Sequence, residues 1–250
     1  MLNKHLDKLL AAIDPSIDTI IQAGVGYGNE VPRLRERFPH ARLFGFEPCR
    51  QFLKYWLDAG YPGVLLPFAL AGSPGMRTLY LRGGRAEASS FYPRANETKA
   101  DSVLAVTLDD MFGAALPGRM CLLWMDCEGA ELDALRGGAA LLKMAVRYCL
   151  IEVADNNLMQ PAAVKAGQQY CEWVQEAVGV VKCKKCDQLV HTIYPPERVH
   201  AECRGRRLHM ASGGDRIGRP SSWEVKDFLV KSGFRLRKAI TKNDLLYERI

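Results

Sequence analysis

Long apolar runs are missing from this 250-residue sequence. No stretch approaches the roughly 18 uninterrupted apolar residues that a membrane-spanning helix needs, so no helical span is expected. The first residues, MLNKHLDKLLAAIDPS, lack the apolar segment of a secretion signal. Internal repeats and low-complexity tracts are absent too, which argues against a disordered, collagen-like or coiled-coil chain. With 48% hydrophobic and 25% charged residues, we expect a cytoplasmic globular protein.

The positive charge is unevenly distributed. Residues 1–154 carry 17 basic and 17 acidic side chains, so the whole net charge of +6 follows residue 154. Such an excess can bind an anionic partner, although it is more often a solvated face. The composition therefore indicates a chain of two parts.

Short apolar segments alternate with helix-like segments over most of the chain. Strands are expected at residues 19–23, 41–46, 64–69, 77–81, 103–108, 120–125 and 147–153, and helices at 3–13, 31–38, 50–59 and 130–142. This alternation is typical of a parallel sheet covered by helices on both faces, and it predicts a doubly wound α/β domain. Residues 83–101, rich in Gly, Ser and Arg, are expected to form a long functional loop.

The later part of the chain is interpreted as an insertion followed by a return to the sheet. Residues 1–154 would form the N-terminal part of the core, 155–220 an insertion, and 221–250 a helix and two strands that complete the core. Within the insertion, residues 161–177 have a helix-like pattern.

A cluster of cysteine and histidine falls inside the predicted insertion. Cys183 and Cys186 form one closely spaced pair, His200 and Cys203 form another, and 13 residues separate the pairs. Two such pairs supply four ligands for tetrahedral zinc, which would be structural because no coordination position stays open. His191 and His209 are alternatives to His200.

Basic side chains surround the predicted zinc ligands, with seven Lys or Arg against three Asp or Glu. A basic zinc module could bind a nucleic-acid backbone through charge. Two further arginines, Arg216 and Arg219, could instead hold an anionic substrate. Nucleic acid is therefore a possible partner, though a less favoured one than a small molecule.

The segment TIIQAGVGYG predicts a ligand-binding loop. A strand leads directly into Gly24, Gly26 and Gly28, where the missing Cβ atoms would let the backbone approach a ligand. Glu47 ends the next strand, 19 residues after Gly28, where a carboxylate can accept both hydroxyls of a ribose. This order favours a nucleoside ligand, and both a dinucleotide and S-adenosylmethionine satisfy it.

A third strand ends in acidic residues, in the segment LLWMDCEGAELDALRGG. Asp126 and Glu128 would face the ligand crevice at the carboxyl edge of the sheet. Glu131 could do the same, or it could cap the following helix. These three carboxylates are the candidates for a general base.

The ordered motifs IIQAGVGYG, LFGFEP, ASSFY, VTLDDMF, LLWMDCEGAELDALRGG and LIEV resemble the FkbM family of S-adenosylmethionine-dependent methyltransferases. The resemblance implies a Rossmann-like sheet of seven strands with an antiparallel last strand, and usually O-methylation. It implies that the three glycines cradle the methionine part of the cofactor, that Glu47 holds the ribose, that Ala69 lies beside the adenine and that Asp126 lies near the methyl group. The implied cofactor set is Ala23, Gly24, Gly26, Gly28, Glu47, Pro48, Ala69 and Asp126.

Two departures from the family pattern stand in the first motif. Gln22 occupies a position where many relatives of this fold carry an acid, and Val25 and Tyr27 replace smaller or polar residues. The favoured hypothesis is O-methylation of a small molecule or glycan. The alternatives are a methyltransferase that reaches RNA or a protein through the zinc module, and a non-catalytic nucleoside-binding protein.

Overall fold

The structure is a computed structural model of the chain. It describes residues 2–82, 85–92, 100–113, 120–153, 173–177, 180–183, 189–191, 222–239 and 244–250. Internal contacts divide the chain into two compact units. The first unit comprises residues 1–92, 97–155 and 220–250, and the second comprises 93–96 and 156–219. The domain boundaries expected from the sequence stay a proposal.

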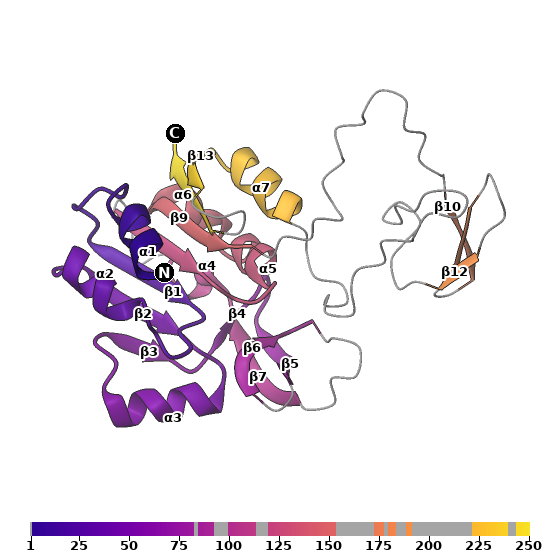
Figure 1. Ribbon diagram of the computed structural model, residues 1–250, viewed down its shortest axis with the longest axis horizontal. Helices are drawn as coiled ribbons and strands as arrows, with labels where there is room; N and C mark the ends of the chain where they lie inside the picture. Colours follow the sequence, from indigo (N-terminus) through magenta and orange to yellow (C-terminus); the bar gives the residue numbers. More distant parts are fainter. Residues whose placement is uncertain are drawn as a thin grey trace. The chain divides into compact units, whose positions relative to one another are not determined.

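A seven-stranded sheet forms the centre of the first unit, in the order β13-β14-β9-β8-β1-β2-β3 (Figure 1). Its strands are β1 (Thr19–Ala23), β2 (Arg42–Phe46), β3 (Val64–Leu66), β8 (Cys121–Met125), β9 (Val146–Glu152), β13 (Phe234–Ala239) and β14 (Asp244–Arg249). The first five of these run parallel, whereas β14 is antiparallel to both β9 and β13. The predicted seven-stranded α/β sheet with its antiparallel last strand is confirmed.

Helices cover both faces of this sheet. The helices are α1 (Leu2–Leu10), α2 (Val31–Arg37), α3 (Arg50–Ala59), α4 (Leu108–Phe112), α5 (Glu131–Arg136), α6 (Ala139–Met144) and α7 (Ser222–Lys231). Ile20 of β1 belongs to the core shared with α1, α2 and α3, and the next residue, Ile21, belongs to the core shared with α4 to α7. Because side chains alternate along a strand, a strand covered on both faces is apolar throughout.

The first unit also contains a second, four-stranded sheet in the order β4-β7-β5-β6 (Figure 1). In the chain, its strands come between β3 and β8 of the main sheet. Its strands are β4 (Ala69–Leu70), β5 (Gly75–Arg82), β6 (Arg85–Ser90) and β7 (Ala100–Val106). The expectation of a loop throughout residues 83–101 is wrong for β6, which pairs antiparallel with β5. The sequence RAEASS has no β-branched or aromatic residue, so strand pairing there leaves no compositional sign.

Two predicted elements are each divided in the structure. The strand expected at 64–69 is split between the sheets, because β3 pairs with β2 and β4 pairs with β7. The helix expected at 130–142 breaks at Gly137 and Gly138. A Cβ on Gly137 would lie 2.2 Å from the Ala71 carbonyl oxygen, and the Asp109 carboxylate accepts hydrogen bonds from Ala140 N and Leu141 N, at the start of α6.

Within the second unit the structure describes β10 (Trp173–Ala177), β11 (Val180–Cys183) and β12 (Leu189–His191), which form an antiparallel sheet. The helix expected at 161–177 is therefore wrong for β10, whose aromatic and β-branched residues suit a strand. Of the predicted zinc ligands, Cys183 ends β11, while Cys186, His200 and Cys203 lie outside the described residues. Zinc stays a prediction, because three of its four expected ligands lie outside the described residues. Within the described ranges no three potential metal ligands are grouped together.

No helix in the described ranges is long and apolar enough to cross a membrane.

Candidate functional site

A cavity of about 320 Å³ opens at the carboxyl ends of β1, β2 and β8. Strand β1 is the point where the sheet order reverses, because the chain runs from β1 outward to β3 and then resumes on the other side with β8. Ligands of doubly wound folds bind at such a reversal. All eight residues of the predicted cofactor set line the cavity: Ala23, Gly24, Gly26, Gly28, Glu47, Pro48, Ala69 and Asp126.

The glycine loop after β1 has a conformation that requires glycine. Gly24, Gly26 and Gly28 have φ of 80°, 54° and 61°, in the left-handed region. A Cβ on Gly24 would lie 2.0 Å from the carbonyl oxygen of Asp126, and one on Gly28 would lie 2.4 Å from the Trp56 ring. At Gly26 a Cβ would meet nothing within 4 Å. Gly26 lines the cavity, so the loop is open to the ligand space at this residue.

Glu47 is buried at the end of β2 and is fixed by the backbone. One carboxylate oxygen accepts from Gly26 N at 2.8 Å and the other accepts from Cys49 N at 2.7 Å. Burial raises the pKa of Glu47, and these backbone hydrogen bonds oppose the rise. Each carboxylate oxygen can accept a second hydrogen bond. The carboxylate is thus positioned to accept two hydroxyl groups from a ligand.

Asp126 and Glu128 line the same cavity from the turn after β8. Desolvation by the surrounding protein, followed by the charges of Glu152 and Glu128, raises the pKa of Asp126 well above its ordinary value. Glu128 has φ of 52°, which side-chain-bearing residues rarely adopt. The hydroxyl of Ser90 donates to the Glu128 carbonyl at 2.7 Å and so helps to hold this turn.

Glu131, the third predicted carboxylate, has a different environment. It is 3% exposed, and one of its oxygens accepts from Cys127 N at 3.1 Å and from Gly129 N at 3.0 Å. It is not among the residues that line the cavity. These contacts hold the turn between β8 and α5, because Cys127 and Gly129 both precede the helix. The capping interpretation of Glu131 stays a prediction.

The sequence analysis missed Glu30, which also lines the cavity. Burial raises the pKa of Glu30 from 4.5 to about 7. Its carboxylate accepts a hydrogen bond from Gln22 at the buried end of β1. The available signal was its position, two residues after the last glycine of the loop, but nothing in the sequence says which way that turn points.

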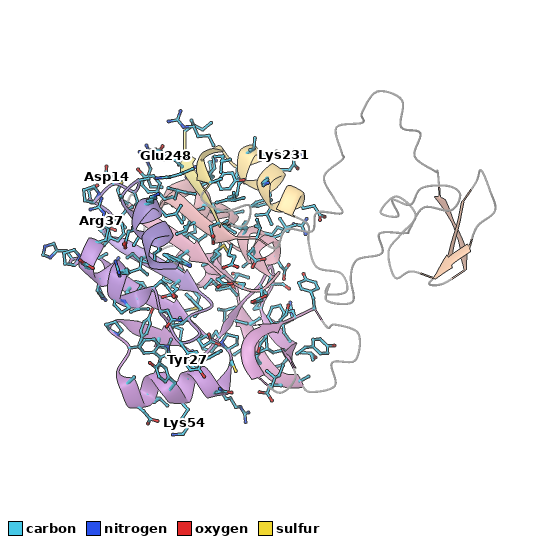
Figure 2. All side chains as sticks on the ribbon, in the orientation of Figure 1. Asp14, Tyr27, Arg37, Lys54, Lys231 and Glu248 are labelled. Atoms are coloured by element: carbon cyan, nitrogen blue, oxygen red, sulfur yellow. The ribbon has the colours of Figure 1, made fainter. Side chains whose placement is uncertain are left out.

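Aromatic and hydroxyl side chains complete the cavity wall, and the sequence analysis assigned no role to most of them. Ser89, Ser90 and Phe91 come from the end of β6, and Phe68 precedes β4. Tyr27 lies over α3, where its ring packs edge-on against Phe52 and Tyr55 (Figure 2). Four carboxylates line the cavity, and among its described lining residues there is no Lys, Arg or His.

Comparison with known proteins identifies the family of the chain. The model of the methyltransferase FkbM domain matches residues 22–178. No curated protein matches the chain. Among solved structures, methyltransferase FkbM from Methylobacillus flagellatus KT is 17% identical, with a TM-score of 0.37, and the match covers 55% of this chain and 33% of that one. The chain thus spans about a third of the length of that structure.

Two further solved structures, which match over nearly the whole chain, are also methyltransferases. A methyltransferase from Mesorhizobium loti is 12% identical with a TM-score of 0.43, covering 97% of this chain and 96% of that one. An amino pentose methyltransferase from Micromonospora echinaspora is 12% identical with a TM-score of 0.40, covering 98% and 87%. Because the family model matches more than half of the sequence, the chain belongs to the FkbM family of S-adenosylmethionine-dependent methyltransferases.

Proposed function

We propose that this protein transfers a methyl group from S-adenosylmethionine to a hydroxyl group of a small molecule or glycan. The observation that carries the proposal is the convergence of the eight predicted cofactor residues on one cavity at the reversal point of the sheet. Family membership supplies the cofactor class.

Four features of the cavity suit this cofactor. The glycine loop presents open backbone at Gly26, so an extended chain can lie against it. Glu47 offers acceptor positions for a ribose diol, and Ala69 with Phe68 offers an apolar wall for a purine ring. The absence of cationic side chains among the described lining residues suits a ligand that carries positive charge on its sulfonium and ammonium groups.

The acceptor hydroxyl would enter beside Asp126 and Glu128. When bound, S-adenosylmethionine supplies an electrophilic methyl group, and the protein then has to orient the acceptor and receive its proton. Asp126 suits proton transfer because its raised pKa makes its ionised form a stronger base than an ordinary carboxylate. Glu128, on the same turn, is the second candidate.

The first experiment is calorimetric titration of the purified protein with S-adenosylmethionine, followed by detection of S-adenosylhomocysteine after incubation with a panel of sugars and other hydroxyl acceptors. We expect binding, turnover with at least one acceptor, and loss of turnover in Asp126→Asn. If the cofactor does not bind and Glu47→Ala changes nothing, the proposal is wrong.

The same experiment distinguishes the alternatives. Methylation of RNA, with binding that weakens steeply as salt rises, would favour delivery by the basic segment around the predicted zinc ligands. Cofactor binding without turnover on any acceptor class would favour a non-catalytic nucleoside-binding protein.

A further inference from the structure

A partly buried chain of hydrogen bonds runs from Tyr61, which follows α3, through Gln22 of β1 to the cavity. The hydroxyl of Tyr61 donates to Gln22 Oε1 at 3.2 Å, and Gln22 Nε2 donates to the Glu30 carboxylate. Gln22 is fully buried and does not line the cavity, whereas Glu30 does. The amide therefore acts from behind the carboxylate that faces the ligand space.

Tyr61 fixes which way the Gln22 amide points. Burial raises the pKa of Tyr61, so the phenol keeps its proton and donates it. With its oxygen occupied by Tyr61, the amide presents its NH₂ group to Glu30. Space for Tyr61 depends on Gly45 of β2, where a Cβ would lie 2.6 Å from the phenol oxygen.

The two carboxylates Glu30 and Glu47 flank the glycine loop. Glu47 contacts the loop at Gly26 and follows β2, while Glu30 follows the loop at the start of α2. Because Glu30, Glu47 and the glycine loop all line one cavity, a ligand with its ribose at Glu47 could reach Glu30 by lying along the loop. A half-buried carboxylate there is unfavourable without a cation, since desolvation disfavours its charged form.

We infer that Glu30 binds the ammonium group at the amino-acid end of the cofactor, and that Gln22, oriented by Tyr61, is the positioning residue behind it. The inference rests on the proposed function. The acid that many relatives of the fold carry at the position of Gln22 would then be replaced in this chain by an amide and a carboxylate eight residues later. Asp126, which also lines the cavity and whose backbone lies against Gly24, is the competing candidate for this cation.

Two probes separate the ends of the ligand. S-adenosylhomocysteine contains both the nucleoside and the amino acid, whereas 5′-methylthioadenosine contains only the nucleoside and its thioether. Calorimetric dissociation constants are measured for both probes with the native protein and with Glu30→Gln, Tyr61→Phe, Asp126→Asn and Glu47→Gln. Glu36→Gln is the matched control, because Glu36 lies exposed on the same helix, α2.

We expect Glu30→Gln to lower the affinity for S-adenosylhomocysteine by roughly 10- to 100-fold, the range for a lost hydrogen bond between charged groups. Its affinity for 5′-methylthioadenosine should stay within about twofold of the native value. Tyr61→Phe should change the ratio of the two affinities in the same direction by a smaller factor. Glu47→Gln should lower the affinities for both probes by the same factor, and Glu36→Gln should change neither affinity.

Three outcomes would overturn the inference. In the first, Glu30→Gln changes neither affinity; in the second, it lowers both affinities equally; in the third, Asp126→Asn, and not Glu30→Gln, alters their ratio. If neither probe binds the native protein, the proposed function itself fails, and that result is distinguishable from an unchanged ratio. Where Glu30→Gln misfolds, as thermal unfolding would report, Glu30→Asp with its shorter carboxylate takes its place.

Discussion

Replacing Glu30 by Gln should stabilise the protein when no ligand is present. Burial raises the pKa of Glu30 from 4.5 to about 7. When a carboxyl group has a higher pKa in the folded state than in the unfolded state, the unfolded chain releases its proton first as pH rises. Stability is therefore lost between the two pKa values and stays low above the higher one. The amide has no proton to release and avoids this loss.

The size of the effect follows from the pKa values. A rise from 4.5 to about 7 corresponds to roughly 3 kcal/mol, at about 1.4 kcal/mol per pKa unit. Glu30 is only half-buried, so solvent in the cavity screens part of this, and about 1–2 kcal/mol should remain. In a chain of this length that difference raises the unfolding temperature by about 3–6 °C.

The assay is thermal unfolding, followed by circular dichroism, of the native protein, Glu30→Gln and the control Glu36→Gln. The advantage of Glu30→Gln should be present at about pH 8 and nearly absent at about pH 4, below both pKa values, where Glu30 is protonated in the folded and in the unfolded state. An advantage that is equal at both pH values, or larger at the lower one, would refute the reasoning. At the same excess concentration, S-adenosylhomocysteine should stabilise the native protein more than the variant, because the stability added by a ligand rises with the logarithm of its affinity.

Three further measurements, two of them on substituted proteins, test the site and the second unit. Gly24→Ala should lower the free energy of unfolding in urea by at least about 2 kcal/mol more than Gly60→Ala does. Both glycines have φ of 80°, but only at Gly24 would the added Cβ contact other backbone atoms. Equal losses in the two variants would contradict this. Ser90→Ala should cost about 1 kcal/mol and lower kcat/KM by about tenfold through the Glu128 turn, and Ser90→Thr should restore both if the hydroxyl is responsible. Protein purified without a histidine tag should contain about one zinc per chain by elemental analysis, and less than about half an equivalent would exclude the predicted structural site.

The sequence was sufficient for the parts of the site that strand ends position. Most residues of β2 and β8 are apolar, so their apolar runs mark them clearly, and the residue after each strand must lie at the carboxyl edge of the sheet. Glu47 and Asp126 were predicted in this way, and both line the cavity. Their catalytic and binding roles stay proposals.

The parts that the sequence did not predict depend on turns and on a second sheet. Ser90 reaches the Glu128 turn because β6 pairs with β5, and the composition of β6 gave no sign of that pairing. The break between α5 and α6 depends on the close approach of Ala71 to Gly137, a contact between residues far apart in the sequence. Such contacts are decided by tertiary packing, which periodicity along one segment does not encode.

Gln22 shows how a departure from a family pattern gains meaning only from its surroundings. Read alone, an amide in place of an acid removes a charge from the cofactor end of β1. In the folded protein, the buried Gln22 side chain contacts a carboxylate that faces the cavity, and Tyr61 fixes its orientation. The charge is therefore retained at the cavity wall, but its position depends on the turn between Gly28 and α2. A comparison of strand-end residues alone would show that the acid is missing at Gln22 and would overlook the carboxylate of Glu30.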